Sequence, residues 1–316
     1  MNFRAARALS ANRLSAAFVH RSAVTTRPLA VLSHTLRVPP TTVAFPTSVR
    51  SFSSSATPLS MASSSSTSGD DILASFSQPQ HGQNVALAME SLATADAVCF
   101  DVDSTVIAEE GIDVLAEFLG QGQAVAALTK QAMEGSQKFQ DALKDRLELM
   151  KPSKQAILSC LDQMPLKLSP GVAELIQALT DNGVHVYFVS GGFRIMIEPV
   201  AEQVGVPVDR IYANTILFDE HGTYTGFDPT EHTSADMGKP AALSAIKAAH
   251  GYDTMVMVGD GATDAQAKPP ANAFIGFGGI VVRPAVQQAA DWFVTDFQDM
   301  TRIVHTYHHN NNSKLN

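Results

Sequence analysis

The chain has 316 residues, 45% of them apolar, and a mean hydropathy near zero, so it can bury a full-sized core and we expect a soluble catalytic domain with an accessory piece. No segment approaches the ~18 consecutive apolar residues that a membrane-spanning helix needs. Fifteen of the 22 basic residues but all 31 acidic residues fall in residues 70–316, whose formal charge of −16 argues against binding to nucleic acid.

Residues 1–69 differ in composition from the rest of the chain. They contain seven arginines, no lysine and no acidic residue, and they are rich in serine and threonine. This composition is typical of an organellar transit peptide that is removed after import. The helical spacing of the first arginines favours a mitochondrion, whereas the serine-rich run at residues 53–68 suits a plastid equally well. A disordered basic arm that binds an anionic partner is the alternative. Residues 70–96 are expected to form a linker and a leading helix.

The first apolar run, residues 97–102, predicts a buried strand that delivers Asp101 and Asp103 at its end. In an open parallel sheet, ligands bind outside the carboxyl ends of the strands. We therefore expect these two aspartates to lie where the chemistry occurs.

Residues 111–164 follow with a purely helical pattern, about four amphipathic segments long. This insertion is predicted to form a helical cap over the end of the first strand. Its apolar stripe between residues 139 and 150 includes one charge, Arg146, and a guanidinium on a buried face requires an anionic partner. A substrate carboxylate would suit it, while Glu110, just after the first strand, could accept an ammonium group. Alternatively, Arg146 and Glu110 pair with each other.

Residues 165–307 alternate between helices and strands. A helix with Ser169 as N-cap and Pro170 at its first position is predicted to lead into a strand at 184–189. Residues 212–227 have the pattern of a β-hairpin. The remaining predicted strands are 254–258, 273–277 and 292–295, and residues 308–316 are expected to be a disordered tail. The prediction is an α/β fold with a Rossmann-like parallel sheet, made of residues 97–110 and 165–307, with the helical cap and a small hairpin inserted.

Two strand ends together deliver four carboxylates, Asp101, Asp103, Asp260 and Asp264. Two like charges ~4 Å apart repel by about 4 kcal/mol at an effective dielectric constant of ~20, so a cluster of this kind requires a cation. Oxygen-only ligands suit Mg²⁺. The two cysteines, Cys99 and Cys160, provide neither a disulfide framework nor a zinc site.

Four motifs, in this order and at these strand ends, resemble those of the haloacid-dehalogenase-type phosphotransferases. The segments 100–111, 189–194 and 274–279 resemble more closely the members of that family that act on phosphoserine. The resemblance covers roughly residues 97–297, although Met237-Gly238-Lys239 differs from the Gly-Gly-Lys that is usual in these members. The four motifs are Asp101-Val102-Asp103-Ser104-Thr105, Ser190-Gly191-Gly192, Lys239, and Gly259-Asp260-Gly261-Ala262-Thr263-Asp264.

The resemblance implies hydrolysis of phosphoserine, the last step of serine synthesis, through a phosphoryl group carried on an aspartate. Asp101 would be the nucleophile, and Asp103 would protonate the leaving oxygen and then activate water. Mg²⁺ would be bound by Asp101, the backbone carbonyl of Asp103 and Asp260. Asp264 would not bind the metal directly but would hold its ligands in position. The remaining implied roles are phosphate binding by Ser190, Gly191, Lys239 and Thr263, and substrate binding by Glu110, Met133, Arg146 and Gly192.

Other interpretations compete with this one. Thr263 could serve only as the N-cap of the next helix. A phosphatase for another small phosphomonoester, or a phosphotransferase to an alcohol, would use the same motifs. A metal-dependent glycosyltransferase would use the Asp-x-Asp but gives no role to Lys239 or Asp264, and an inactive binding module would lack Asp101. Phosphoserine is the expected small-molecule partner, with a homodimer as an open alternative to a monomer.

Overall fold

A six-stranded parallel sheet forms the centre of the part of the chain that the structure describes, residues 80–134 and 137–312 of a computed structural model. Its strands are short apolar runs, and β1 and β6 are buried along their whole length, as expected for strands that are covered on both faces. The order across the sheet is β3-β2-β1-β6-β7-β8, so β1 lies in the middle. The strands are β1 (Ala97–Phe100), β2 (His185–Phe193), β3 (Ile211–Asn214), β6 (Met255–Gly259), β7 (Ala273–Phe277) and β8 (Trp292–Val294).

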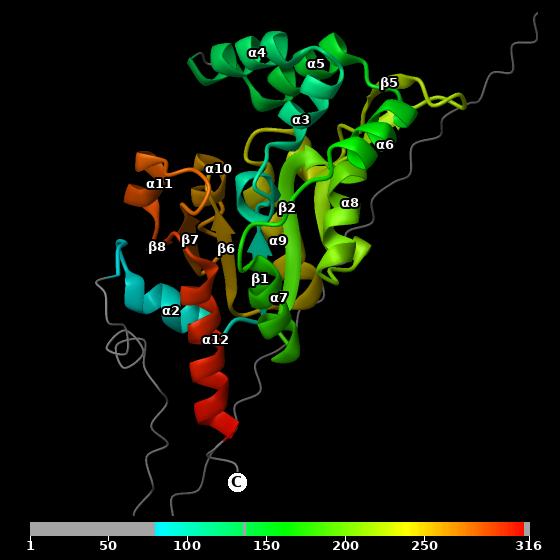
Figure 1. The fold of residues 1–316 in the computed structure, drawn as a ribbon. Coiled ribbons are helices and arrows are strands. Elements are labelled where there is room, and N and C mark those ends of the chain that lie inside the picture. The colour runs from blue at the N-terminus through cyan, green and yellow to red at the C-terminus, as the bar shows by residue number, and fades with distance from the viewer. Residues whose placement is uncertain (1–79, 135–136, 313–316) are drawn as a thin grey trace, which may run out of the picture. The chain divides into compact units, whose positions relative to one another are not determined.

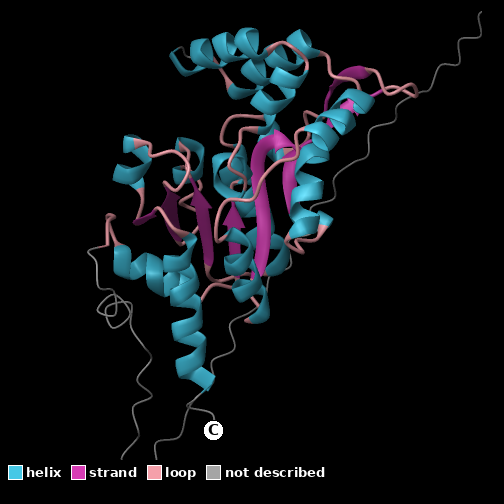
Figure 2. Ribbon diagram, viewed as in Figure 1, coloured by secondary structure: helices cyan, strands magenta, loops and turns pink. Residues whose placement is uncertain are grey.

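Helices cover both faces of this sheet (Figure 2). Alternate side chains of β1 enter two separate apolar clusters: Val98 and Phe100 belong to one, and Ala97 and Cys99 to the other. The predicted α/β fold with a parallel sheet is confirmed. The first cluster is covered by α2 (Val85–Ala93), α7 (Val172–Asp181), α8 (Arg194–Gln203) and α12 (Phe297–Asn312), and the second by α9 (Gly238–His250), α10 (Ala262–Ala265) and α11 (Pro284–Ala289).

Four helices separate β1 from α7, as the helical pattern of this segment predicted. Figure 1 shows α3, α4 and α5 above the carboxyl ends of the strands, and α6 beside α8. Leu143 and Leu147 on α5 are buried, so the apolar stripe of that helix faces its neighbours. The four helices are α3 (Gly111–Phe118), α4 (Gly122–Glu134), α5 (Phe139–Met150) and α6 (Lys154–Gln163), and we refer to them together as the helical insertion.

The hairpin is present but shorter than predicted. Its strands β4 (Ile216–Phe218) and β5 (Tyr224–Phe227) pair antiparallel, and Gly222 has the positive φ of 77° that the turn requires. Residues 212–214, which the sequence pattern assigns to the hairpin, belong instead to β3 and pair with β2 in the main sheet. The local pattern is the same for both arrangements, and only the packing against β2 separates them.

Three predicted helix ends are placed differently in the structure. The N-cap of α7 is Gly171, whose φ is 80°, and the hydroxyl of Ser169 is buried with no hydrogen-bond partner, so the predicted Ser169 cap is wrong. Gly261 rather than Thr263 is the N-cap of α10. Helix α12 continues to Asn312, past the start of the predicted disordered tail, because its buried face, with Met300, Ile303 and Val304, anchors a helix that polar residues can extend.

The described part of the chain begins just before α2. Asn84 caps that helix by accepting a hydrogen bond from the amide of Leu87. The predicted transit peptide, residues 1–69, lies outside the described residues. No helix among the described residues is both long and apolar enough to span a membrane.

Candidate active site

Two aspartates stand side by side where neighbouring strands end. Asp101 follows β1 and Asp260 follows β6, and the two strands pair in parallel register. The amide of Asp101 donates to the carbonyl of Val258 at 2.8 Å, which extends the ladder to the aspartate itself. The structure therefore brings the motif after β1 and the motif after β6 together at one edge of the sheet, as predicted.

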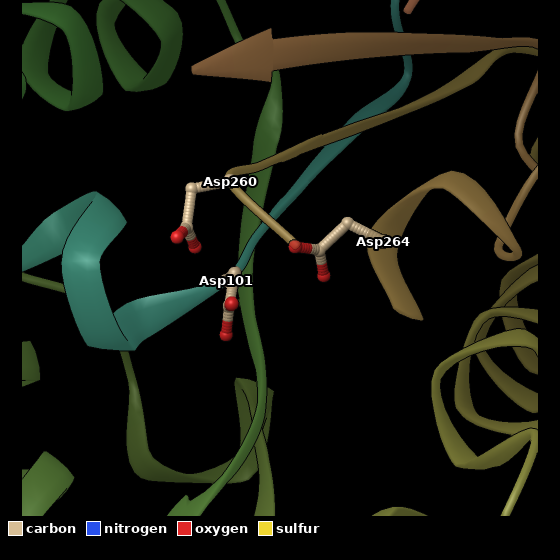
Figure 3. A group of neighbouring side chains, drawn as sticks. All are labelled: Asp101, Asp260 and Asp264. Carbon is tan, nitrogen blue, oxygen red and sulfur yellow. The ribbon is translucent and has the colours of Figure 1, made fainter. Parts of the chain in front are cut away.

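Asp264 joins these two aspartates to form a buried carboxylate cluster. It projects from α10 toward the strand ends, and one oxygen from each of Asp101, Asp260 and Asp264 lies within 4.8 Å of the others (Figure 3). Its Oδ2 accepts a hydrogen bond from the Gly261 amide at 2.8 Å. Three carboxylates with only oxygen donors fit a hard divalent cation such as Mg²⁺.

Two cationic side chains compensate part of the negative charge of the cluster. Lys239 Nζ lies 2.8 Å from Asp101 Oδ1 and 2.5 Å from Asp264 Oδ1, and Arg283 Nη2 lies 2.7 Å from Asp260 Oδ2. Burial of Lys239 opposes its charge, but the two aspartates outweigh burial and raise its pKa. Lys239 therefore stays protonated, and an ammonium group in this position can attract a phosphate next to Asp101.

Asp103 is held in a tight turn, Val102–Val106 (η1), between β1 and the helical insertion. Its Oδ1 accepts from the Gly111 amide at 2.6 Å, and its Oδ2 accepts from the Ser190 hydroxyl at 3.1 Å. Burial, with a further contribution from the charge of Asp101, raises the pKa of Asp103 to about 6. This carboxyl can therefore carry a proton near neutral pH and also release it.

The glycines around Asp103 are required by close approach. A Cβ on Gly192 would lie 2.6 Å from Asp103 Oδ2, so a larger residue would displace that carboxyl group. The Gly192 amide donates to the Ser190 hydroxyl at 2.8 Å, and that hydroxyl donates in turn to Asp103. Ser190 therefore bridges Gly192 and Asp103. Ser190 is fully buried, and its hydroxyl is held by these two hydrogen bonds. Gly191, in contrast, lines the cavity.

A cavity of about 950 Å³ opens between these strand ends and the helical insertion. From the sheet side it is lined by Asp101, Asp103, Lys239 and Thr263, and from the other side by Glu110, Phe139, Leu143 and Arg146. The predicted catalytic and substrate-binding groups thus share one cavity. Met133 lies in the last turn of α4, but its side chain lies outside the described residues.

Glu110 and Arg146 do not bond to each other. Glu110 Oε1 accepts from the Ser104 hydroxyl at 2.7 Å and lies 3.6 Å from Arg283 Nη2, whereas Arg146 Nε donates to the carbonyl of Ala142 at 3.0 Å. Burial and the charge of Asp103 raise the pKa of Glu110 to about 7. Burial lowers the pKa of Arg146, and Asp113 and Glu110 partly counteract this. The alternative prediction, that Arg146 and Glu110 pair with each other, is therefore wrong.

Arg283 is the main residue of the site that the sequence interpretation missed. Its Nε lies 2.8 Å from Asp260 Oδ2, and the same guanidinium reaches toward Glu110, so it links the carboxylate cluster to the substrate side of the cavity. The residue follows the carboxyl end of β7, the edge of the sheet where ligands bind. Its place after that strand was a usable signal.

The comparisons with known proteins agree with this geometry. The family model described as haloacid dehalogenase-like hydrolase matches residues 98–267. The chain is similar to the phosphoserine phosphatase of Drosophila melanogaster, with 47% identity over 215 residues that cover 68% of this chain and 80% of that protein. The chloroplastic phosphoserine phosphatase of Arabidopsis thaliana is 47% identical over 225 residues, covering 70% of this chain and 76% of its own. A solved substrate-bound phosphoserine phosphatase complex matches with a TM-score of 0.57 and 28% identity over 65% of this chain and 95% of that one.

Proposed function

Because the chain belongs to the haloacid dehalogenase-like hydrolases and, among them, to the phosphoserine phosphatases, we propose that it hydrolyses O-phospho-L-serine to L-serine and phosphate. The observation that carries this proposal is the position of Asp101, which faces the cavity with Lys239 at 2.8 Å and Arg146 on the opposite wall. A nucleophile, a phosphate-binding cation and a carboxylate-binding cation thus lie in one cavity.

In the first step, an Asp101 oxygen forms a bond to phosphorus while the bond from phosphorus to the serine oxygen breaks. Asp103 gives its proton to that oxygen. In the second step, Asp103 takes a proton from water, whose oxygen attacks phosphorus and releases Asp101 and inorganic phosphate. A pKa of about 6 suits Asp103 to both transfers.

The phosphoryl group would be bound by Lys239, the Ser190 hydroxyl, the Gly191 amide and Thr263. Asp101, the backbone carbonyl of Asp103 and Asp260 would hold Mg²⁺, with Asp264 fixing the geometry through its bonds to Lys239 and Gly261. The cation would neutralise charge on the phosphoryl oxygens.

The serine part of the substrate would lie against the helical insertion. Arg146 keeps Nη1 and Nη2 for a carboxylate in bidentate geometry, because only its Nε bonds to Ala142. Glu110 would accept the substrate ammonium group, and Met133 and Gly192 would complete the contacts. We assign residues 111–164 as a cap that selects this leaving group, and residues 97–110 and 165–307 as the catalytic core.

This reaction would be the last step of serine synthesis. We propose that it takes place in an organelle, either a mitochondrion or a plastid. Two observations support the organelle: the arginine-rich, acid-free composition of residues 1–69, and the similarity to a chloroplastic relative. A homodimer stays a prediction.

The test is phosphate release by the purified protein with Mg²⁺ from phosphoserine, phosphothreonine and phosphoethanolamine. We expect phosphoserine to be turned over fastest, chelation of the metal to stop the reaction, and Asp101→Asn to reduce turnover to background. Turnover that survives in the Asn variant would contradict the covalent mechanism. A preference for one of the other esters would instead favour a phosphatase with a different small substrate.

A further inference from the structure

Helix α5 of the helical insertion begins with a cap that comes from the other side of the cavity. Its N-cap residue, Lys138, makes no side-chain capping bond. The amide of Phe139, at the start of the helix, donates instead to Asp236 Oδ1 at 2.9 Å, across 97 residues of sequence. The first amides of a helix have no partner within the helix, and an aspartate is among the best residues to supply one. Asp236 therefore does for α5 what a local N-cap would do.

The contact is reciprocal. The amide of Asp236 donates to Gln140 Oε1, on the next residue of α5, at 3.4 Å. This exchange of a backbone amide and a side-chain oxygen in both directions follows the logic of a capping box, here made between two distant segments. Its acidic member also faces the positive end of the helix dipole. The pair holds the start of α5 against the loop that leads into α9.

The two segments that meet here carry the two halves of the substrate site. Asp236 stands three residues before Lys239, which lies beside Asp101. Phe139 stands two helical turns before Arg146, on the same helix and toward the same cavity. The Phe139 ring also lies over the phosphate side, since a Cβ on Gly191 would be 3.0 Å from its Cζ. The distance between the Lys239 and Arg146 sides of the cavity thus depends on this contact.

Asp236 is exposed at the cavity wall, so its bond to Phe139 competes with water and adds only modestly to stability.

We propose that Asp236 is a positioning residue, which caps α5 from across the cavity and thereby holds Arg146 at the distance from Asp101 that a phosphorylated amino acid spans. This inference rests on the proposed function, because it uses Arg146 as the carboxylate-binding group.

The test compares Asp236→Ala with Asp236→Asn. Asparagine keeps the capping oxygen and removes the charge, whereas alanine removes both. Asp253→Ala is the matched control, because Asp253 is an exposed aspartate just before β6, at the opposite end of that strand from the site. Hydrogen exchange of the Phe139 amide reports the contact directly, and kinetics with phosphoserine and with p-nitrophenyl phosphate report its effect on the two halves of the site.

We expect Asp236→Ala to speed exchange at Phe139 and to raise KM for phosphoserine about fivefold, at nearly unchanged kcat. Its KM for p-nitrophenyl phosphate, which has no carboxylate for Arg146 to bind, should stay as in the wild type. Asp236→Asn and Asp253→Ala should resemble the wild type in both measurements.

Three results would overturn the inference: unchanged exchange at Phe139 in Asp236→Ala, equal losses for both substrates, or an Asp236→Asn variant as impaired as the alanine variant. Failure of the proposed function looks different. In that case the wild type would hydrolyse p-nitrophenyl phosphate but not phosphoserine, and a fast-exchanging Phe139 amide in the wild type would then reject the capping contact by itself.

Discussion

Arg146 occupies an unusual place for a cationic side chain. It lies on the stripe of α5 that also carries Leu143 and Leu147, and burial lowers its pKa, which shows that its surroundings disfavour the charge. A charge retained under these conditions needs an anion to compensate it. Its hydrogen bond is to the neutral carbonyl of Ala142, and the nearby Asp113 and Glu110 only partly counteract the effect of burial, so a further anion is expected to arrive with the substrate.

Substitution of Arg146 should therefore change selectivity rather than chemistry. We expect Arg146→Ala to lower kcat/KM for phosphoserine about 100-fold, since a charge-assisted bidentate contact contributes ~3 kcal/mol. Phosphoethanolamine, which lacks only the carboxylate, should lose almost nothing. Steady-state kinetics on the two esters measure the ratio.

Arg146→Lys is the control for charge alone. Lysine keeps the cation but not the planar fork, so its kcat/KM for phosphoserine should fall between those of the wild type and the alanine variant. Equal losses on both esters in Arg146→Ala would show that the residue maintains the helical insertion rather than binding the carboxylate.

The segment before α2 is an element that completes the sheet. The amides of Gln83 and Asn84 donate to the carbonyls of Ala290 and Asp291, at 2.9 and 3.0 Å, and the amide of Phe293 donates to the carbonyl of His81 at 2.7 Å. Trp292 Nε1 donates to Gln80 at 3.0 Å. Residues 80–84 thus cover the outer edge of β8, which would otherwise be an unpaired strand edge.

A chain that begins at residue 85 should be less stable than one that begins at residue 70. The loss of four backbone bonds and three side-chain bonds, one of them the Asn84 cap of α2, predicts a decrease of about 3 kcal/mol in the free energy of unfolding, since several of these bonds are exposed to water. Chemical denaturation of the two chains measures it. Equal denaturation midpoints for the two chains would mean that residues 80–84 contact the edge of β8 without stabilising the protein.

The charge balance of the site affects the stability of the whole molecule. Asp103 and Glu110 have pKa values of about 6 and about 7 in the folded protein, both above their ordinary values. The folded state therefore binds more protons than the unfolded state between pH ~4 and ~7, and the stability from these groups is lost as pH rises through their folded pKa values. His185, whose pKa burial lowers, acts in the opposite direction as a single, partly exposed group.

We expect the metal-free protein, kept in a chelator, to lose about 5 °C in Tm between pH 5 and pH 8. Mg²⁺ should restore more stability at pH 8 than at pH 5, because it binds the ionised carboxylates. Thermal unfolding with and without Mg²⁺ at both pH values is the measurement. Glu110→Gln should reduce the loss, and a metal-free Tm that rises with pH would contradict the interpretation.

The N-terminal segment and the rest of the chain have opposite net charges. Residues 1–69 carry seven arginines without an acidic residue, while residues 70–316 carry the entire negative charge. We expect a fluorescent protein fused to residues 1–69 to be imported into an organelle, as microscopy would show. The same fusion with Arg4, Arg7 and Arg13 changed to glutamine should stay outside, and import of this variant would exclude the arginines as the signal.

Local patterns determined much of this protein. Apolar runs placed five of the six sheet strands, and helical spacing predicted the four helices of the insertion. The motif that begins at Asp101 and the one that ends at Asp264 were predicted to meet, because parallel strands bring their carboxyl ends to one edge. These features depend on a few consecutive residues and on rules that hold for every parallel sheet.

Only the tertiary structure decided the remainder. It assigned residues 212–214 to β3 instead of the hairpin, capped α7 with Gly171 instead of Ser169, and brought Arg283 onto Asp260. It also paired Phe139 with Asp236. Each of these outcomes is a choice between contacts that the local sequence permits equally, and the packing of segments far apart in the chain makes that choice.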